Sequence, residues 1–434
     1  MGIINGLRPL EELFSRNDGY PTASSTIQAN TERSVYELFK EVKDDQTVDQ
    51  VKLDRDTHIE YVRNSLDGLN RYFVILDASK PWLCYWMFHS LDLLGYEIGS
   101  DLIKRGISTI SKMQNKTGGF GGGPGQISHA AVTYAAINTL AILGTKEAYD
   151  LIDRDNLYKW FLKLKQPDGS FIMHEGGEVD IRGTYCVLSA ATLTNLVTPE
   201  LTAGTAEWIK RCQNFDGGIG GEPGIEGHGG YAFCGLASME MMGKSDMLDI
   251  PLLLHWASSL QMQVEGGFQG RPNKLVDGCY SFWVGALFPV LEAILTRQRY
   301  KKNEPDEENL GYVAQSLFDR EALQEYILIA CQYPRGGLID KPKRSPDHYH
   351  TCYCLSGLST SQNHVIYDIE EEMEKGVTNP GARSLLWAED IAGTFVIGDP
   401  ENLVKATHPI HNITLPQVQK IIEYFYGNNI DSSK

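Results

Sequence analysis

A short glycine turn, led in each case by a glutamine, recurs along this chain and limits the folds open to it more than any other feature. The turns QNKTGGF, QPDGSF, QNFDGGI, QVEGGF and QYPRGGL end at Phe120, Phe171, Ile219, Phe268 and Leu338. Successive turns are 51, 48, 49 and 70 residues apart. Self-similarity at a period of about fifty residues indicates that one structural unit is repeated along the chain.

Each repeated unit is expected to be a pair of helices. An apolar stretch rich in small residues follows the turn, as in SHAAVTYAAINTLAILG at 128–144, and a more amphipathic stretch comes next, as in KEAYDLIDRDNLYKWFLKLKQ at 146–166. A helix that is apolar on all sides is buried, whereas a helix with one polar face is exposed on that face. Similar apolar stretches at 81–95 and 350–359 bring the apolar helices to six.

The repeated helix pairs predict an all-α fold. Stacked pairs bury their apolar faces on one another, and one helix of each pair is apolar nearly all round. We therefore expect a closed α-α barrel, or toroid, of about six helix pairs with the apolar helices inside. The glycine turns then lie at one rim, where a cavity would be the natural place for a binding site. The turns also serve as helix caps, which alone would explain the glycines.

We expect residues 1–434 to form a single barrel domain with three additions. An N-terminal extension covers about 1–55, and a loop is inserted at about 297–318, where the polar segment RQRYKKNEPDEENLGY accounts for the longer last spacing. A C-terminal closing segment covers about 362–434 and contains a predicted amphipathic helix at 414–429.

Composition excludes several classes of protein. The chain has 42% hydrophobic and 22% charged residues, which is typical of a globular protein rather than a disordered one. Its net charge of −17 argues against nucleic acid as a partner. We find no apolar stretch long enough for a membrane span and no signal peptide, so we expect a cytoplasmic protein. Eight cysteines in 434 residues are too few for a disulfide framework.

The segment Asp277-Gly278-Cys279 and the segment DHYHTC at 347–352 begin successive apolar helices and form a candidate metal site. Residues i and i+2 do not share a helix face, so Asp277 and Cys279 converge only in a turn, which Gly278 allows. A thiolate, an imidazole and a carboxylate suit zinc, and three protein ligands leave an open fourth position, as in catalytic sites. By spacing alone, His348 and His350 are rival ligands, and a buried cysteine beside a capping aspartate is the simpler interpretation.

A second group of residues is cationic. His228, Arg271 and Lys274, together with Tyr280, lie just beyond consecutive glycine turns in a chain that is otherwise acidic. Helix N-termini add amide groups that favour an anion, so the group predicts an anion pocket. Solvated rim charges are the alternative, and the basic run at 341–344 is more typical of a surface loop.

A third group is aromatic. Such residues usually form core packing, but inside a barrel too wide to fill itself they would line an apolar funnel. The members are Trp82, Trp86, Tyr185, Tyr231, Phe282, Trp283, Tyr349 and Tyr353. A funnel, an anion clamp and a zinc with a free position together suggest a long lipid diphosphate presented to a metal-activated nucleophile.

In these segments the chain resembles the β subunits of the protein prenyltransferases, particularly those that transfer farnesyl groups. The resemblance covers about residues 60 to 360. The segments that carry it are PWLCYWMFHSLDLLG, DIRGTYC, GHGGYAFCGL, GGFQGRPNKLVDGCYSFW and DHYHTCYCLSGL. It implies a heterodimer with an α subunit that transfers a farnesyl group from farnesyl diphosphate to the cysteine thiol of proteins ending in CaaX motifs.

The resemblance also implies a role for each candidate residue. Zinc would be bound by Asp277, Cys279 and His350, with the substrate sulfur as fourth ligand, so His348 would not be a ligand. The diphosphate would be held by His228, Arg271, Lys274 and Tyr280 with a lysine of the α subunit. Apart from the resemblance, Asp347 is a candidate to orient a zinc-bound histidine, with a surface aspartate or a helix cap as the equal alternative. The isoprenoid would contact Arg182, Tyr185, Cys234 and Trp283, and the last residue of the CaaX peptide would contact Trp82, Trp86 and Tyr349.

Three positions favour a fifteen-carbon donor over a twenty-carbon one. Asp340 corresponds to an acid that binds magnesium on the diphosphate in farnesyl enzymes, whereas the resembling type I geranylgeranyl enzymes carry lysine there. Trp82 tends to be a small residue in those enzymes, and Tyr353 is the third discriminator. A type I geranylgeranyltransferase β subunit is nevertheless the alternative assignment. A terpenoid cyclase, for which we find no DxDD-type motif, and a non-enzymatic helical toroid are rivals of other classes.

Overall fold

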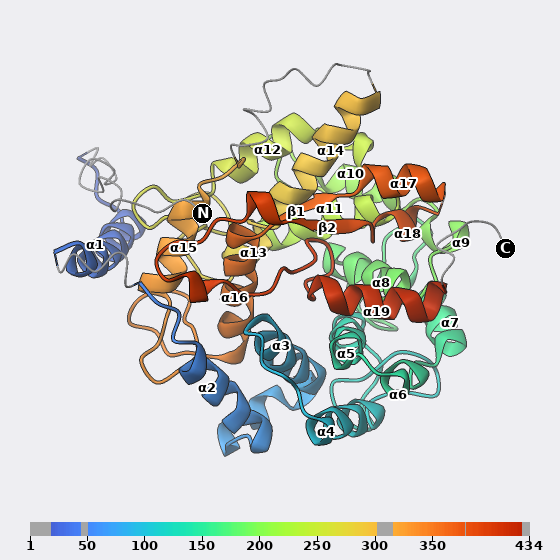
Figure 1. The fold of residues 1–434 in the computed structure, drawn as a ribbon. Coiled ribbons are helices and arrows are strands. Elements are labelled where there is room, and N and C mark those ends of the chain that lie inside the picture. Colours follow the sequence, from blue (N-terminus) through green and yellow to red (C-terminus); the bar gives the residue numbers. More distant parts are fainter. Residues whose placement is uncertain (1–18, 45–50, 302–315, 378, 428–434) are drawn as a thin grey trace.

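Six segments of apolar helix surround the axis of the molecule in this computed structural model, which describes residues 19–44, 51–301, 316–377 and 379–427 (Figure 1). They are α3 (Lys80–Leu93), α5 (Ala130–Leu143), α8 (Ile181–Leu193), α11 (Gly229–Met241), α13 (Tyr280–Trp283) with its continuation α14 (Leu287–Lys301), and α16 (His348–Gln362). Each segment packs on the next, and α16 packs on α3, so the ring is closed. The predicted all-α barrel is confirmed.

A second layer of helices surrounds the inner ring. These helices are amphipathic: on α4, for example, Ile107 and Ile110 are buried whereas Ser108 and Thr109 are exposed. The outer helices are α2 (Arg55–Asp67), α4 (Ser100–Ser111), α6 (Lys146–Asp150), α7 (Arg154–Leu164), α9 (Pro199–Thr202), α10 (Thr205–Cys212), α12 (Ile250–Ser258) and α15 (Arg320–Glu325), which continues into η6 (Tyr326–Ala330). The short helices η3 (Arg71–Ser79) and η4 (Ser245–Met247) lie in connections.

The glutamine of a glycine turn connects its turn to the next outer helix. The Gln114 side chain donates to the carbonyl of Leu151 at 2.9 Å and accepts from the amide of Asp153 at 3.1 Å. Gln332, in the last turn, makes the equivalent pair of bonds to Lys52 and Asp54, both at 2.8 Å. Since Asp54 immediately precedes α2, these bonds close the outer layer from the last repeat to the first.

Two turns differ from the predicted pattern. In the second turn Lys165, rather than Gln166, pairs with Phe171, and its ammonium donates to Thr205 Oγ1 at 2.9 Å. In the fourth turn Gln261, rather than Gln263, pairs with Phe268. The side chain that connects a turn to the next outer helix is therefore defined by its position in the turn. This side chain is a lysine in the second turn.

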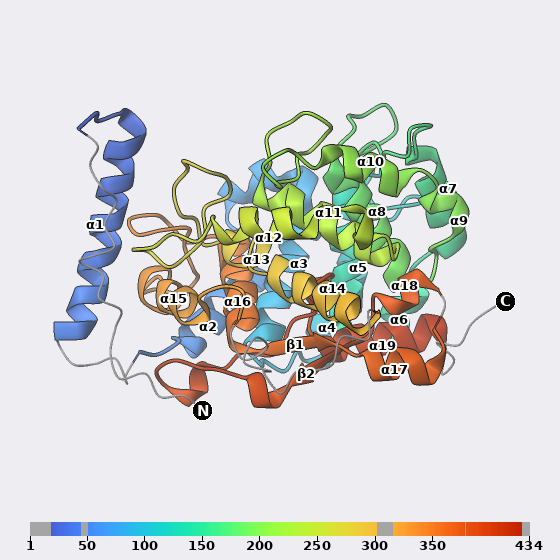
Figure 2. The same cartoon turned by 90° about the horizontal axis from the view of Figure 1, so that it is seen from above.

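Backbone hydrogen bonds between neighbouring repeats align the starts of the inner helices. The amide of Ala130 donates to Met173 at 2.7 Å, and the amide of Gly278 donates to Asp340 at 2.7 Å. Ile181 makes the same kind of bond at the start of α8. The glycine turns consequently lie at one end of the barrel, and the C-terminal segment lies at the other (Figure 2).

The fifth inner segment is not the continuous helix expected at 277–295. It breaks between α13 and α14, where a side chain at Gly285 would place its Cβ 2.1 Å from the carbonyl oxygen of Ser281. Pro289 lacks an amide donor and so makes no helical bond there. The α14 helix continues to Lys301 and so includes the start of the loop expected at about 297–318, and residues 302–315 lie outside the described residues.

The two ends of the chain add elements to the barrel. Helix α1 (Ala23–Asp44) stands beside the barrel near η6 (Figure 2). The C-terminal segment contains a two-stranded antiparallel sheet of β1 (His364–Tyr367) and β2 (Trp387–Asp390), in which His364 pairs with Asp390. It also contains α17 (Ile369–Lys375), α18 (Pro380–Arg383), η7 (Ile391–Gly393), η8 (Pro400–Asn402) and α19 (Leu415–Tyr426).

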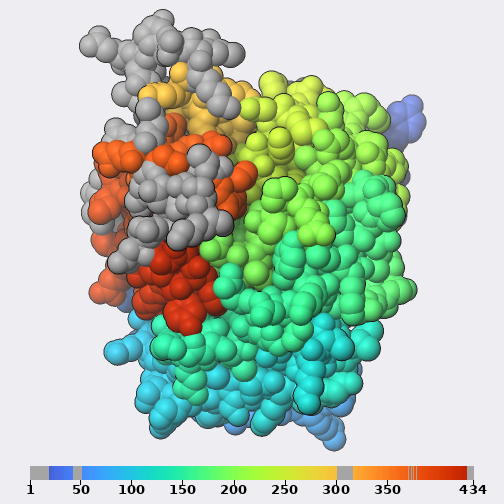
Figure 3. All heavy atoms as spheres, turned by 90° about the vertical axis from the view of Figure 1, so that its right-hand side faces the viewer, coloured from blue at the N-terminus to red at the C-terminus, as the bar shows by residue number. Residues whose placement is uncertain are grey.

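A buried stretch at residues 407–414, here called the C-terminal plug, lies at the end of the barrel opposite the glycine turns. Helix α19 follows the plug and packs on α5, α6 and α8. It corresponds to the amphipathic helix predicted at 414–429. In Figure 3 the red surface of the C-terminal segment borders the green surface of the middle of the chain. Among the helices of the described residues, none has the length and apolar character that a membrane crossing needs.

Candidate active site

The candidate metal ligands of two successive repeats meet at the rim of the barrel. Asp277 and Cys279 lie in the turn that begins α13, and His350 lies in the first turn of α16. One ligand atom from each residue lies within 4.8 Å of the others, and His350 Nε2 is 3.2 Å from Asp277 Oδ1. Gly278 permits this because a Cβ there would lie 2.5 Å from Cys354 Sγ.

Asp347 fixes the orientation of the His350 ring through the second ring nitrogen, Nδ1. This Nδ1 lies 2.8 Å from Asp347 Oδ2, and the backbone amide of His350 donates to Asp347 Oδ1 at 2.7 Å. Asp347 is thus both the N-cap of α16 and the partner of the imidazole. Asp347 can hold a proton on Nδ1, so that Nε2 would offer its lone pair to a cation bound beside Asp277 and Cys279, as metal-binding histidines generally require.

The electrostatics of the three ligands are strongly coupled. Burial lowers the pKa of His350, but its bonds to Asp277 and Asp347 raise it to about 12. Burial raises the pKa of Asp277, yet the bond and charge of His350 hold it at about 2. Burial raises the pKa of the Cys279 thiol to about 12. Without a cation, the protonated imidazole of His350 therefore supplies the positive charge among these ligands. A bound divalent cation would supply this charge instead.

The donor set fits zinc. Sulfur, imidazole nitrogen and carboxylate oxygen are its usual ligands, and three protein ligands correspond to a catalytic site with one open position. His348, the rival at sequence level, is turned away and packs against the ring of Tyr61 with centroids 4.9 Å apart. The geometry therefore selects His350 among the two histidines.

Of the predicted anion-binding residues, Tyr280 directly follows the ligand Cys279 and contacts His228, whereas Arg271 and Lys274 have other surroundings. His228 Nδ1 accepts from the amide of Gly230, so its Nε2 carries the proton that faces the Tyr280 hydroxyl at 2.9 Å. Arg271 forms an ion pair with Glu226. Lys274 is exposed, and no carboxylate of the described residues forms an ion pair with it.

A cavity of about 510 Å³ opens beside this cluster and extends into the barrel. Its wall is mainly aromatic and includes most of the predicted contacts. The lining residues are Trp82, Trp86, Ala131, Tyr134, Met173, Arg182, Tyr185, Cys186, His228, Gly230, Tyr231, Cys234, Tyr280, Trp283, Tyr349 and Tyr353.

The aromatic wall is continuous with the metal site. Trp283 Nε1 donates to the Tyr349 hydroxyl at 3.0 Å, and the rings of Trp283 and Tyr353 stack with centroids 4.5 Å apart. Trp86 packs edge-on against Tyr349 at 5.6 Å and against Trp82 at 5.6 Å. Because Tyr349 immediately precedes His350, a ligand in the cavity would lie next to the metal.

Arg182 and Asp340, like Arg271, form ion pairs within the protein. Arg182 is paired with Asp180 through two nitrogens, the closest contact being 2.6 Å. The Asp340 carboxylate accepts from Lys341 at 2.6 Å and lies 3.8 Å from Arg344. Asp340 is therefore not part of the metal cluster.

Five lining residues were not among the predicted ones: Ala131, Tyr134, Met173, Cys186 and Gly230. Tyr134 lies four residues after the start of α5, as Tyr185 does in α8, so superimposing the repeats would have found it. Met173 and Cys186 carry no sequence signal of this kind.

Comparison with known proteins agrees with this geometry. The family described as prenyltransferase alpha-alpha toroid domain matches residues 53–413. A protein farnesyltransferase subunit beta of Arabidopsis thaliana is 35% identical, with 96% of this chain and 92% of the relative covered. Another of Pyricularia oryzae is 40% identical over 86% of this chain and 74% of the relative. The chain belongs to the protein farnesyltransferase β-subunit family. It is accordingly a subunit of a prenyl-transferring enzyme.

Geranylgeranyl transferases are more distant relatives that share the fold. The type-1 geranylgeranyl transferase subunit beta of Arabidopsis thaliana is 28% identical over 72% of this chain and 86% of the relative. A solved structure, described as Candida albicans protein geranylgeranyltransferase-I complexed with GGPP, superimposes with a TM-score of 0.62 at 19% identity and covers 86% of this chain and 99% of that one. The greater identity lies on the farnesyltransferase side.

Proposed function

We propose that the chain is the catalytic β subunit of a zinc-dependent farnesyltransferase that joins a farnesyl group to the cysteine thiol of C-terminal CaaX motifs. The observation that carries the proposal is the meeting of Asp277, Cys279 and His350 beside a deep aromatic cavity. A partner α subunit is part of the proposal, since the relatives are named as β subunits.

The three ligands would bind zinc with the peptide's cysteine sulfur at the open position. When bound, zinc supplies the charge that keeps this sulfur deprotonated at neutral pH. Asp347 holds the proton of His350 at Nδ1 and so keeps Nε2 available as a ligand. Tyr349 and Trp86, beside His350, would contact the end of the peptide.

The aromatic cavity would hold the isoprenoid with its C1 atom near the ligands. The reaction forms a bond between sulfur and C1 and breaks the bond from C1 to the diphosphate oxygen, which leaves with the electron pair. Tyr185, Cys234 and Trp283 line the wall along the proposed chain, and their apolar surfaces exclude water from the allylic carbon.

The cationic residues would stabilise the charge that develops on the departing diphosphate. Lys274 is free of ion pairs within the described residues, and the Nε2 proton of His228 and the Tyr280 hydroxyl can be redirected to phosphate oxygens. Arg271 would exchange Glu226 for the diphosphate. Magnesium usually takes one or two carboxylates and completes its shell with phosphates and water, so Asp340 could hold it after releasing Lys341.

The alternative is a type I geranylgeranyltransferase β subunit. Trp82 lines the cavity and takes up space that a longer chain would need, and the geranylgeranyl relative is less similar. A terpenoid cyclase or a toroid that only binds other proteins would not require the Asp277, Cys279 and His350 cluster.

The proposal is tested by co-purifying the chain with its α subunit and measuring transfer to a CaaX peptide from both prenyl diphosphates. We expect about one zinc ion per chain by elemental analysis, lost together with transfer in Cys279→Ala. Cys212→Ala, which changes a buried cysteine of α10 far from the ligands, is the matched control. Full transfer by a metal-free protein would refute the proposal.

A further inference from the structure

Tyrosines from three neighbouring inner helices donate hydrogen bonds to three consecutive carbonyls of the C-terminal plug. The order along the helices α8, α5 and α3 matches the order along the plug. The pairs are Tyr185 with Ile410 at 2.7 Å, Tyr134 with His411 at 3.1 Å, and Tyr85 with Asn412 at 2.6 Å. All three tyrosines are at most 1% exposed.

The plug is also held by side chains that do not reach the cavity. His411 Nδ1 lies 2.8 Å from Ser189 Oγ on α8, and Thr414 Oγ1 donates to Asp92 of α3 at 2.6 Å. Its position is therefore fixed by the helices on both sides of α5 and does not depend on a ligand.

Two of these tyrosines belong to the wall of the aromatic cavity, and the third packs behind them. Tyr134 and Tyr185 line it directly. Tyr85 is not a lining residue, but its ring packs against Tyr134 at 5.9 Å and against Trp82 at 6.0 Å. If the ring of Tyr85 or Tyr185 tilts away from its present position, it loses its bond to the plug and leaves a buried carbonyl without a donor, which is costly. The carbonyl of His411 also accepts from Asn138 Nδ2 at 3.2 Å, so it keeps one donor if Tyr134 moves.

We infer that the C-terminal plug sets the depth of the cavity, and hence the length of prenyl chain accepted, through its hydrogen bonds to these three tyrosines. The inference rests on the proposed function, because it places a prenyl chain in the cavity. The plug residues are positioning residues: they act on the chain through Tyr85, Tyr134 and Tyr185. Trp82, which also lines the cavity, then limits the length of the prenyl chain only in part.

The test uses two variants that loosen the plug without changing the cavity lining, Tyr85→Phe and Ser189→Ala. In the complex with the α subunit, farnesyl and geranylgeranyl diphosphate compete for binding, and the ratio of their dissociation constants is measured. We expect each variant to shift the ratio toward the twenty-carbon donor by about fivefold, the change in a binding constant that one hydrogen bond of typical strength makes.

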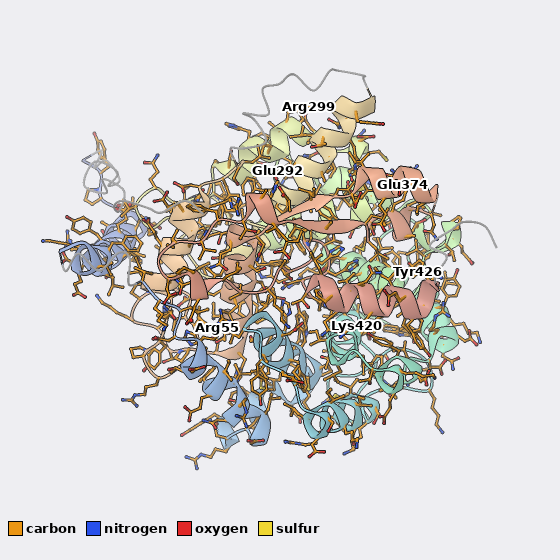
Figure 4. All side chains as sticks on the ribbon, viewed as in Figure 1. Arg55, Glu292, Arg299, Glu374, Lys420 and Tyr426 are labelled. Carbon is orange, nitrogen blue, oxygen red and sulfur yellow. The ribbon has the colours of Figure 1, made fainter. Side chains whose placement is uncertain are left out.

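Tyr426→Phe is the matched control. Tyr426, labelled in Figure 4, donates from α19 to the carbonyl of Thr192 at 2.6 Å and lies outside the cavity lining. This variant should leave the ratio unchanged. An unchanged ratio in Tyr85→Phe and Ser189→Ala, or an equal shift in Tyr426→Phe, would overturn the inference.

Failure of the inference and failure of the proposed function have different signatures. A wild-type complex that binds neither diphosphate contradicts the proposed function. A wild-type complex that prefers farnesyl diphosphate, with variants that keep the same preference, contradicts only the role of the plug. If Tyr85→Phe does not fold, Ser189→Ala alone decides, because it removes a hydroxyl of α8 and keeps all three tyrosines.

Discussion

Asp347→Asn should lower zinc affinity while leaving the fold nearly intact. In the wild type, Asp347 Oδ1 caps α16 and Oδ2 accepts from His350 Nδ1 at 2.8 Å. Asparagine can keep the cap through its carbonyl oxygen, but it then turns an NH₂ group toward Nδ1. Two donors cannot face each other, so the imidazole proton moves to Nε2, the nitrogen that faces Asp277 at 3.2 Å. His350 then has no lone pair for the metal.

We expect the loss of affinity to be about tenfold to a hundredfold, the usual effect of removing a partner of a metal-bound histidine. The assay is competition for zinc with a chromophoric chelator, with thermal unfolding measured in parallel. Asp347→Ala should show the same loss and also about 1 kcal/mol lower stability, because the helix cap is lost.

The control is Asp153→Asn, which makes the same chemical change at the N-cap of α7. Asp153 accepts from the amide of Asn156 at 3.1 Å and has no metal ligand as partner. Unaltered zinc affinity in Asp347→Asn, or an equal loss in Asp153→Asn, would refute the tautomer argument.

Three further predictions concern the donor, magnesium and acid stability. Trp82→Thr should enlarge the cavity and raise the use of geranylgeranyl diphosphate; unchanged competition between the two donors would contradict this. Asp340→Lys should abolish the magnesium dependence of single-turnover transfer, and the same magnesium titration curve in wild type and variant would count against it. Burial lowers the pKa of His89 to about 4 and that of His411 to about 3. Since the unfolded chain takes up protons below about pH 6.5, the free energy of unfolding should fall by about 2 kcal/mol per histidine at pH 5. Urea unfolding at pH 7.5 and pH 5 measures this, and equal stability at both would be the contrary result.

The ring of helices could be predicted from sequence because glycine turns and apolar periodicity are local signals. The break at Gly285 could not, because the apolar pattern continues through it; there the amide of Gly285 donates to the carbonyl of Tyr280, five residues back, and the regular helical hydrogen bonds are interrupted. The same holds for Lys165, which takes over the role of a glutamine through its contact with Thr205, a residue of the next repeat.

The candidate site shows a similar division. The sequence pattern predicted that Asp277 and Cys279 lie at the start of one helix, and the resemblance favoured His350 as the third ligand. The structure places His350 beside the other two. The ion pairs of Arg182 with Asp180 and of Asp340 with Lys341 join near neighbours in sequence, but they were not predicted, because the sequence does not determine the side-chain conformations that bring the charges together. The plug at 407–414 could not be predicted either. Its backbone carbonyls accept the hydrogen bonds of the tyrosines, and every residue has such a carbonyl, so the sequence gives no signal.

The bonds from Gln332 to Lys52 and Asp54 have a consequence for biosynthesis. They join residues 280 and 278 positions apart, so the first helix of the outer layer has no permanent neighbour on one side until most of the polypeptide has left the ribosome. An open solenoid could fold one repeat at a time. In this chain, by contrast, the first outer helix keeps an exposed apolar edge until the last repeat has been synthesised. Chaperone capture during translation would protect that edge, and premature termination anywhere before residue 332 would leave the circle incomplete.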